Sequence, residues 1–154
     1  MSIIALKPFR LFSLPLLAVA LCAGLAGCAH VDRKLEAGRD PAALREVYVL
    51  TNLNDHRGMA RRIVAALRER GVTAEAGPRT LLPETAEAVL RYEERWAWDF
   101  GEHMTFFRLT LSEPDQVRPY AVATRTRYVA RSTDLASVVP EVVAELMAPA
   151  AGKN

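Results

Sequence analysis

Cysteine is nearly missing from this sequence, and the two that occur stand close to its amino terminus. Cys22 and Cys28 are the only thiols among 154 residues. A disulfide framework, a Cys-ligated zinc site and a cysteine nucleophile are therefore excluded together for the chain beyond residue 28. The lack of a free thiol there suits an oxidising compartment such as the bacterial periplasm.

Motifs that mark catalytic or metal sites are absent as well. Among three histidines, only His56 beside Asp55 and His103 beside Glu102 could meet as ligands. Neither pair shows ligand spacing such as His-Glu-x-x-His or His-x-His. No serine lies in a Gly-x-Ser-x-Gly turn, and no glycine-rich phosphate loop follows the first expected strand. We therefore expect no catalytic residue, no metal site and no cofactor.

The sequence also lacks a strong charge of either sign. It holds 20 Lys+Arg against 18 Asp+Glu, and residues 1–27 contribute Lys7 and Arg10 but no acid. Without that segment the balance is 20 − 2 = 18 cations against 18 anions. Nucleic-acid binders normally carry a marked positive excess, so we expect no nucleic-acid partner. The hydrophobic share of 51% argues against disorder.

The longest uncharged run lies at the amino terminus and has the layout of a secretory signal. Lys7 and Arg10 precede an apolar stretch over residues 11–23, which is too short for a membrane span. Four residues then resemble the lipobox of bacterial lipoproteins, namely Leu25, Ala26, Gly27 and Cys28. Residues 1–27 would accordingly be a lipoprotein signal peptide. The alternatives are an uncleaved anchor or ordinary cleavage near Ala23.

The lipobox resemblance implies where the protein resides. It implies cleavage before Cys28, a diacylglycerol thioether on the sulfur and acylation of the new amino group. Several acyl chains, at about 0.8 kcal/mol per buried CH₂, anchor a protein stably. The next residue is Ala29 instead of Asp, which in similar Gram-negative lipoproteins implies export to the outer membrane. We expect a lipid-anchored protein on its periplasmic side.

Hydrophobic patterning predicts one domain behind a tether. Residues 28–44 show no sustained apolar period and contain Gly38 and Pro41, which predicts a flexible tether. Residues 45–148 form the expected domain, and residues 149–154 a disordered tail. Strands are expected at residues 46–51, 72–76, 88–100, 104–111 and 120–129, and helices at residues 58–70 and 134–147.

The order of these elements predicts an α/β (α+β) fold. Asn54 or Asp55 offers a cap for the first helix, and Gly71 ends it. Pro140 interrupts the second helix, which either kinks there or begins there. The order β-α-β-β-β-β-α places two helices on one face of a five-stranded mixed sheet.

This element order behind a lipobox resembles the small domains of bacterial envelope proteins such as the amino-terminal domain of TolB and lipoproteins of the LptE type. The chain also resembles a group of small lipoproteins with a Tyr-Glu-x-Arg-Trp-x-Trp-Asp run, which here spans residues 92–99. The resemblance implies an envelope location and carries over no activity.

Alternation along residues 88–100 separates two candidate sites. One face would hold an aromatic stripe with one carboxylate, the candidate pocket residues Tyr92, Glu94, Trp96 and Trp98. Packing beneath the helices is the plainer interpretation of the aromatic residues, and a ligand pocket is the alternative. Glu94 would point inward, so it must be partnered by an arginine, protonated or near an edge.

The opposite face would be rich in arginine. A meander of three strands would bring five guanidinium groups onto it, from Arg91, Arg95, Arg108, Arg125 and Arg127. Met104 and Phe106 are expected on the same face. This is either a solvated cross-strand charge ladder or a binding face that reads carboxylates or phosphates bidentately.

We therefore predict a non-catalytic, lipid-anchored binding or assembly module of an envelope complex, held at the membrane by Cys28 and bound to an envelope protein partner. The alternative is a periplasmic lipoprotein that binds an anionic small molecule or a glycan. A periplasmic hydrolase is the third hypothesis.

Overall fold

The sheet of this protein is mixed and has six strands in the order β1-β6-β5-β4-β2-β3. The computed structural model describes residues 30–99, 101–127 and 132–150. The strands are β1 (His30–Leu35), β2 (Glu46–Leu50), β3 (Thr73–Gly77), β4 (Ala88–Ala97), β5 (His103–Ser112) and β6 (Ala121–Thr126). The helices are α2 (Met59–Glu69) and α3 (Leu135–Leu146), with short 3₁₀ turns η1 (Pro41–Ala43) and η2 (Arg79–Leu81).

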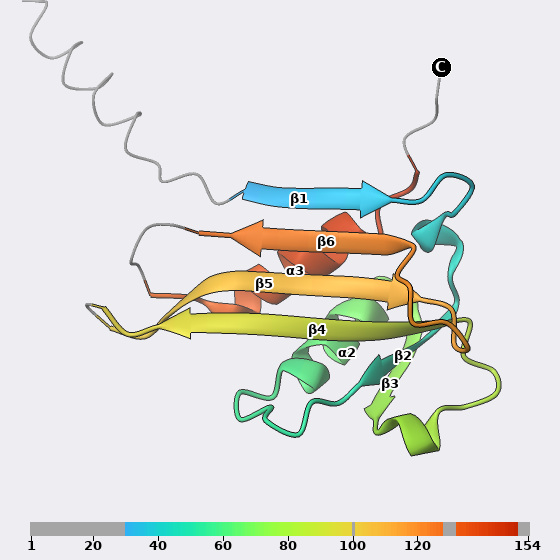
Figure 1. Cartoon of the computed structure of the whole chain (residues 1–154), viewed down its shortest axis with the longest axis horizontal. Helices are drawn as coiled ribbons and strands as arrows, with labels where there is room; N and C mark the ends of the chain where they lie inside the picture. The colour runs from blue at the N-terminus through green and yellow to red at the C-terminus, as the bar shows by residue number, and fades with distance from the viewer. Residues whose placement is uncertain (1–29, 100, 128–131, 151–154) are drawn as a thin grey trace, which may run out of the picture.

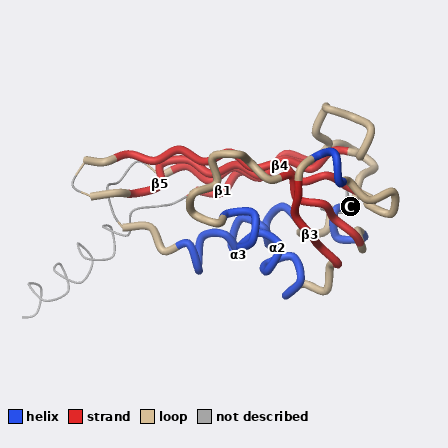
Figure 2. Tube along the Cα trace, turned by 90° about the horizontal axis from the view of Figure 1, so that it is seen from below, coloured by secondary structure: helices blue, strands red, loops and turns tan. Residues whose placement is uncertain are grey.

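Both helices cover the same face of the sheet, and the other face has no helix over it within the described ranges (Figures 1 and 2). β2 pairs in parallel with β3 and β4, as expected for a β-α-β unit, and the other neighbours are antiparallel. The predicted α+β class with two helices and one mixed sheet is confirmed. None of the helices in these ranges is both long and apolar enough to cross a membrane.

The expected number of five strands is wrong, because residues assigned to the tether form β1. Its six residues pair with β6 along their whole length. Val31, Arg33 and Leu35 are half-buried toward the helices, while the residues between them are exposed. The strand therefore has one amphipathic face, but Arg33 interrupts its apolar side and hides the pattern in the sequence.

The core lies between the helices and the sheet. Ile63 and Leu67 of α2 and Val142 and Leu146 of α3 are fully buried against the sheet, as their helical spacing predicts. Phe107 is the largest fully buried side chain of β5. α3 begins after Asp134, whose carboxylate accepts from the backbone N–H of Ala136 at 3.0 Å, and it continues through Pro140.

The start of α2 depends on a side chain outside the helix. Gly58 precedes it with φ 65° and offers no capping side chain. The Asp55 carboxylate instead accepts from the N–H groups of Met59 at 2.7 Å and Ala60 at 2.8 Å, and from the Tyr92 hydroxyl at 3.0 Å. Burial raises the pKa of Asp55, but the hydrogen bonds together lower it by more than burial raises it. The pKa of Asp55 therefore lies below its ordinary value. Asp55 thus ties α2 to β4.

A second fixed point lies where β2 meets the edge strand β3. Tyr48 is 3% exposed, and its hydroxyl donates to the carbonyl of Pro78 at 3.0 Å. The ring crosses Gly77, where any Cβ would collide with the Tyr48 hydroxyl. Glycine at position 77 is therefore required by the close approach of this ring.

A β-bulge in β5 sets which side chains reach each face. Arg95 lies opposite Phe106, but the next residue, Trp96, lies opposite Met104, so Thr105 is the extra residue. The bulge turns Met104 toward the helices, where it is 1% exposed. The expectation that Met104 shares the arginine-bearing face is therefore wrong, whereas Phe106 does lie there.

Candidate binding face

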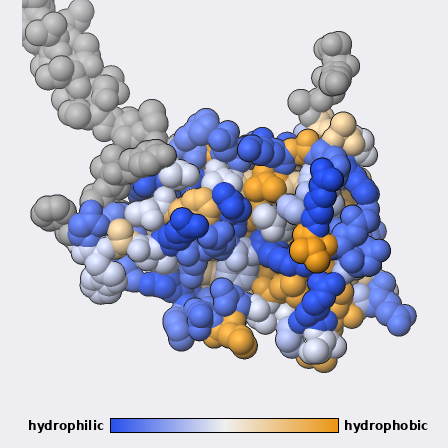
Figure 3. All heavy atoms as spheres, in the orientation of Figure 1, coloured by the Kyte–Doolittle hydropathy of each residue, from blue (hydrophilic) through white to orange (hydrophobic). Residues whose placement is uncertain are grey.

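The sheet face opposite the helices is the candidate binding face, and we call it the open face. Its strands alternate, so that every second side chain of β1, β4, β5 and β6 projects from it. The open face carries Asp32, Lys34, Arg91, Glu93, Arg95, Phe106, Arg108, Thr110, Val122 and Thr124. A space-filling view of this face is mostly hydrophilic, with apolar side chains in separate small groups (Figure 3).

Two arginines and one aromatic ring form the centre of the open face. The guanidinium carbon of Arg95 lies 4.9 Å from the ring centroid of Phe106, and that of Arg108 lies 4.8 Å away. Glu93 accepts from Arg95 at 2.9 Å and lies 3.8 Å from Arg108. One carboxylate thus faces two guanidinium groups, which leaves the cluster with a positive excess. Both arginines are held in place by cation–π contact with Phe106.

A shallow hollow of about 410 Å³ adjoins this cluster. It crosses from β1 over β6 to β5, and its lining comprises Asp32, Lys34, Arg108, Thr110, Pro119, Val122 and Thr124. The Nε of Arg108 donates to the Thr124 hydroxyl at 3.3 Å, which fixes the guanidinium at the rim. The two cations and two hydroxyls can bind an anionic group from several sides, and the Asp32 carboxylate can accept from a hydroxyl group of the same ligand.

One of the five predicted face arginines, Arg125, does not lie on the open face. Arg125 of β6 points toward α3, is 5% exposed, and its Nε lies 3.3 Å from a carboxylate oxygen of Glu141. The pKa of Arg125 lies below its ordinary value, chiefly because the side chain is buried. The charge of the nearby Arg127 also lowers this pKa, whereas Glu141 raises it. Arg127 follows the end of β6, where its N–H donates to the carbonyl of Thr105 at 3.0 Å. Arg125 pairs with the buried Phe107 of β5, so the register of β6 places it on the helix side.

The candidate pocket residues separate into two environments. Tyr92 and Trp96 pack against the core, as the plainer interpretation expected. The pKa of Tyr92 is raised to about 12, chiefly by burial and also by Asp55. The hydrogen bond from the N–H of Asn52 opposes this shift. Trp98 is 76% exposed, so its assignment to an inward stripe is wrong. Phe100, the last residue of the expected stripe, lies outside the described residues.

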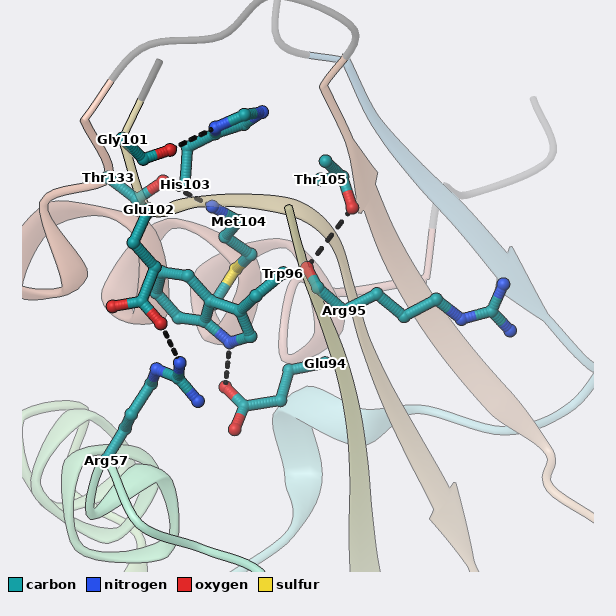
Figure 4. A network of polar contacts seen from close by, with 10 residues as sticks. All are labelled: Arg57, Glu94, Arg95, Trp96, Gly101, Glu102, His103, Met104, Thr105 and Thr133. Carbon is teal, nitrogen blue, oxygen red and sulfur yellow. Dashed lines mark hydrogen bonds and ion pairs between the residues drawn. The ribbon is translucent and has the colours of Figure 1, made fainter. Parts of the chain in front are cut away.

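Glu94 and Trp96 belong to a polar network at the hairpin between β4 and β5 (Figure 4). Glu94 accepts from the indole Nε1 of Trp96 at 3.1 Å, so its partner is an indole and not the expected arginine. Arg57, from the loop before α2, lies 4.1 Å from the Trp96 ring centroid and pairs with Glu102. The guanidinium of Arg57 stacks over the indole of Trp96. These contacts hold the loop before α2 against the hairpin between β4 and β5.

The two histidines do not meet. His103 is 5% exposed, with Nδ1 3.0 Å from the carbonyl of Gly101 and Nε2 3.8 Å from Asp99. His56 is exposed in the loop before α2. Across the described residues, no three His, Cys, Asp or Glu side chains are grouped to hold a metal ion.

Sequence reasoning missed the contribution of β1 to the open face. Asp32 and Lys34 were assigned to a tether, yet they line the hollow. Their alternation with Val31 and Leu35 was the available signal. Cys28 and the other lipobox residues lie outside the described residues, so lipidation stays a prediction.

Comparisons with known proteins identify the fold alone. No protein-family model matches the chain, and no curated protein does either. Among solved structures, the PelC dodecamer from Paraburkholderia phytofirmans is 18% identical, with a TM-score of 0.53 over 78% of this chain and 95% of that chain. A PelC variant dodecamer from the same organism is 17% identical, also with a TM-score of 0.53. A PDZ-domain protein from Parabacteroides distasonis is 8% identical, with a TM-score of 0.48 over 77% of this chain and 34% of that chain.

Proposed function

We propose that this chain is a non-catalytic, lipid-anchored subunit of a bacterial envelope assembly, which binds its protein partner in the periplasm through the open face. One observation carries the proposal: the face of β1, β6, β5 and β4 that points away from the helices bears arginines held in fixed positions, and no helix in the described ranges covers it. Arginine and aromatic side chains are enriched in the centres of protein interfaces.

Two further points support an assembly role. A chain of the same fold is known as a dodecamer, so this architecture has a precedent for assembly, and the partner is proposed to include further copies of the chain. Rings of identical subunits arise from head-to-tail contacts between two different surfaces. The proposed acyl chains on Cys28 would anchor all copies in the outer membrane. Copies held in one plane have a higher effective concentration for binding one another.

The test compares two pairs of arginine substitutions in the full, lipidated chain. Arg95→Gln with Arg108→Gln removes two charges from the open face, and Arg61→Gln with Arg70→Gln removes two from exposed positions of the α2 side. Crosslinking in intact cells followed by native mass spectrometry measures the assembled fraction. We expect the open-face pair to lose at least tenfold of it and the α2 pair to retain it.

Equal assembly by the two paired variants would contradict the role of the open face. Circular dichroism and urea unfolding must first show that both variants keep the fold. Lipidation is measured separately, by the mass of the mature chain. Residues remaining before Cys28, or an unmodified Cys28, would contradict the anchor.

The hollow favours a second candidate function, the binding of an anionic small molecule or glycan. Its volume of about 410 Å³ falls within the usual range of ligand sites, and Lys34 and Arg108 provide two cations. Glucuronate and inorganic phosphate are suitable probes. Thermal stabilisation by either probe without a partner, lost in Lys34→Ala, would support this function over assembly.

A further inference from the structure

The start of β1 limits how far the lipid anchor can lie from the folded sheet. β1 begins at His30, and Cys28 stands only two residues earlier. Two residues of fully extended chain span at most about 7 Å. If Cys28 carries the acyl chains, the bilayer surface must therefore lie close to this end of the sheet. The structure leaves no long tether between the anchor and the domain.

The hairpin between β4 and β5 projects from the same end of the sheet (Figure 1). The strand pairings define one row across the sheet, through His30, Thr126, Phe106 and Arg95. Beyond this row the chain reaches Trp98 after three more residues, or about 10 Å at the rise of a strand. Cys28 lies up to about 7 Å beyond the same row. Three strand spacings separate the two laterally, about 14 Å.

Of the two tryptophans near the hairpin, Trp98 is exposed to solvent and Trp96 is held by neighbouring side chains. Trp96 is held by the hydrogen bond to Glu94 and by the guanidinium of Arg57. Trp98, two residues further, is 76% exposed. Indole side chains are amphipathic, and they concentrate at the headgroup level of membranes. An exposed indole at the height of a lipid anchor is therefore positioned for the interface of a bilayer.

The charges near the hairpin indicate the kind of lipid contact. Asp99 beside Trp98 is 65% exposed, and Arg57 is paired with Glu102. Among the described residues of the hairpin between β4 and β5, these groups give no free positive excess with which to attract anionic headgroups. The contact would therefore depend on insertion of the indole into the interface, and it should resist salt.

We propose that Trp98 forms a second membrane contact, inserted at the headgroup level of the bilayer that holds the acylated Cys28. The proposal rests on the lipid anchor of the proposed function. Two contacts about 14 Å apart would set the strands upright on the membrane. The open face would then point sideways, toward neighbouring molecules in the plane of the membrane, and not toward the lipid.

Tryptophan fluorescence can test the proposal, because the chain has two tryptophans. The full lipidated protein is reconstituted in phosphatidylethanolamine–phosphatidylglycerol vesicles that contain phosphatidylcholine brominated high on its acyl chains. Trp96→Phe leaves Trp98 as the probe, and Trp98→Phe leaves Trp96. We expect bromolipid to quench Trp98 at least twice as strongly as Trp96, with no change in 0.5 M salt as estimated from screening over about 4 Å.

A matched control places the probe at the opposite end of the sheet. Val117 is 80% exposed in the loop between β5 and β6, so Val117→Trp in a background without the two native tryptophans should show no bromolipid quenching. Should Trp96→Phe fail to fold, ¹⁹F spectra of the 5-fluorotryptophan-labelled natural chain resolve both indoles, with a spin-labelled lipid as the broadening agent.

The outcomes separate this proposal from the lipid anchor. If the chain is acylated and floats with vesicles, but aqueous iodide quenches Trp98 and bromolipid does not, the second contact is overturned and the anchor stands. Shielding of Trp98 that appears only when a partner protein is added also overturns it. If the mass shows no acyl chain and the protein does not float, the proposed anchor itself fails.

Discussion

Replacing Asp55 with alanine should destabilise the protein more than the loss of an ordinary helix cap. Such a loss costs about 1 kcal/mol. Here the carboxylate accepts from two backbone N–H groups and from the Tyr92 hydroxyl, and hydrogen bonds to a charged group contribute about 1.5–3 kcal/mol. Because the site is only partly buried, we expect a total loss of about 2–3 kcal/mol in the free energy of unfolding.

A double-mutant cycle isolates the link between α2 and β4. Tyr92→Phe removes the hydroxyl that donates to Asp55 and accepts from the N–H of Asn52 at 3.2 Å. We expect this single change to cost about 1 kcal/mol. Combined with Asp55→Ala, the losses should fall short of additivity by about 1 kcal/mol, since both changes break the same hydrogen bond.

The pH dependence of the effect follows from the lowered pKa of Asp55. A carboxyl group with a lower pKa in the folded state stabilises the fold above its unfolded pKa, and the stabilisation is lost as the pH falls through the folded pKa. The deficit of Asp55→Ala should therefore be largest at neutral pH and shrink below a pH of about 4. Urea unfolding followed by circular dichroism at several pH values measures it. A deficit below about 0.5 kcal/mol, or one independent of pH, would refute this account.

Three further predictions concern substitutions at Glu141, Gly77 and Pro140. Glu141→Ala leaves the buried Arg125 without its ionic partner and should cost about 1–3 kcal/mol in urea unfolding, most of which Arg125→Met should restore. Gly77→Ala drives a Cβ into the Tyr48 hydroxyl and should cost about 1–3 kcal/mol, whereas Tyr48→Phe in the same chain should cost less than the sum of the two changes. Pro140→Ala restores a backbone donor within α3 and should raise the melting temperature, with a gain of about 1 kcal/mol; a loss would show that proline is required there.

The elements with regular patterns could be predicted from the sequence, and the irregular edge strand could not. The apolar residues of α2 have helical spacing, and the β-branched run of β2 is typical of a buried strand. Each pattern therefore predicts a single type of secondary structure. In β1, Arg33 occupies an inward position, and its guanidinium NH1 reaches the carbonyl of Pro149 at 3.2 Å. That contact joins residues 116 positions apart, so no local pattern could reveal why a charge is tolerated on the inner side.

The candidate site was predicted in part, because strand parity depends on register. Arg91, Arg95 and Arg108 were placed on the correct face by simple alternation. Met104 changes face because of the bulge at Thr105, and Arg125 because of how β6 pairs with β5. A shift of one residue exchanges the two faces of a strand, and nothing in the residues near Arg125 distinguishes the two registers.

The pairing of β1 also determines how the domain bears mechanical load. β1 lies antiparallel to β6 over six residue pairs, and it begins at the end from which the preceding chain departs. Tension applied through that chain pulls β1 along its own axis, so that its inter-strand hydrogen bonds lie across the force and share it. The bonds would have to slide together in shear, because they cannot open one at a time as in peeling. The pairing of β1 with β6 therefore resists a force that pulls the domain away from the chain that precedes it.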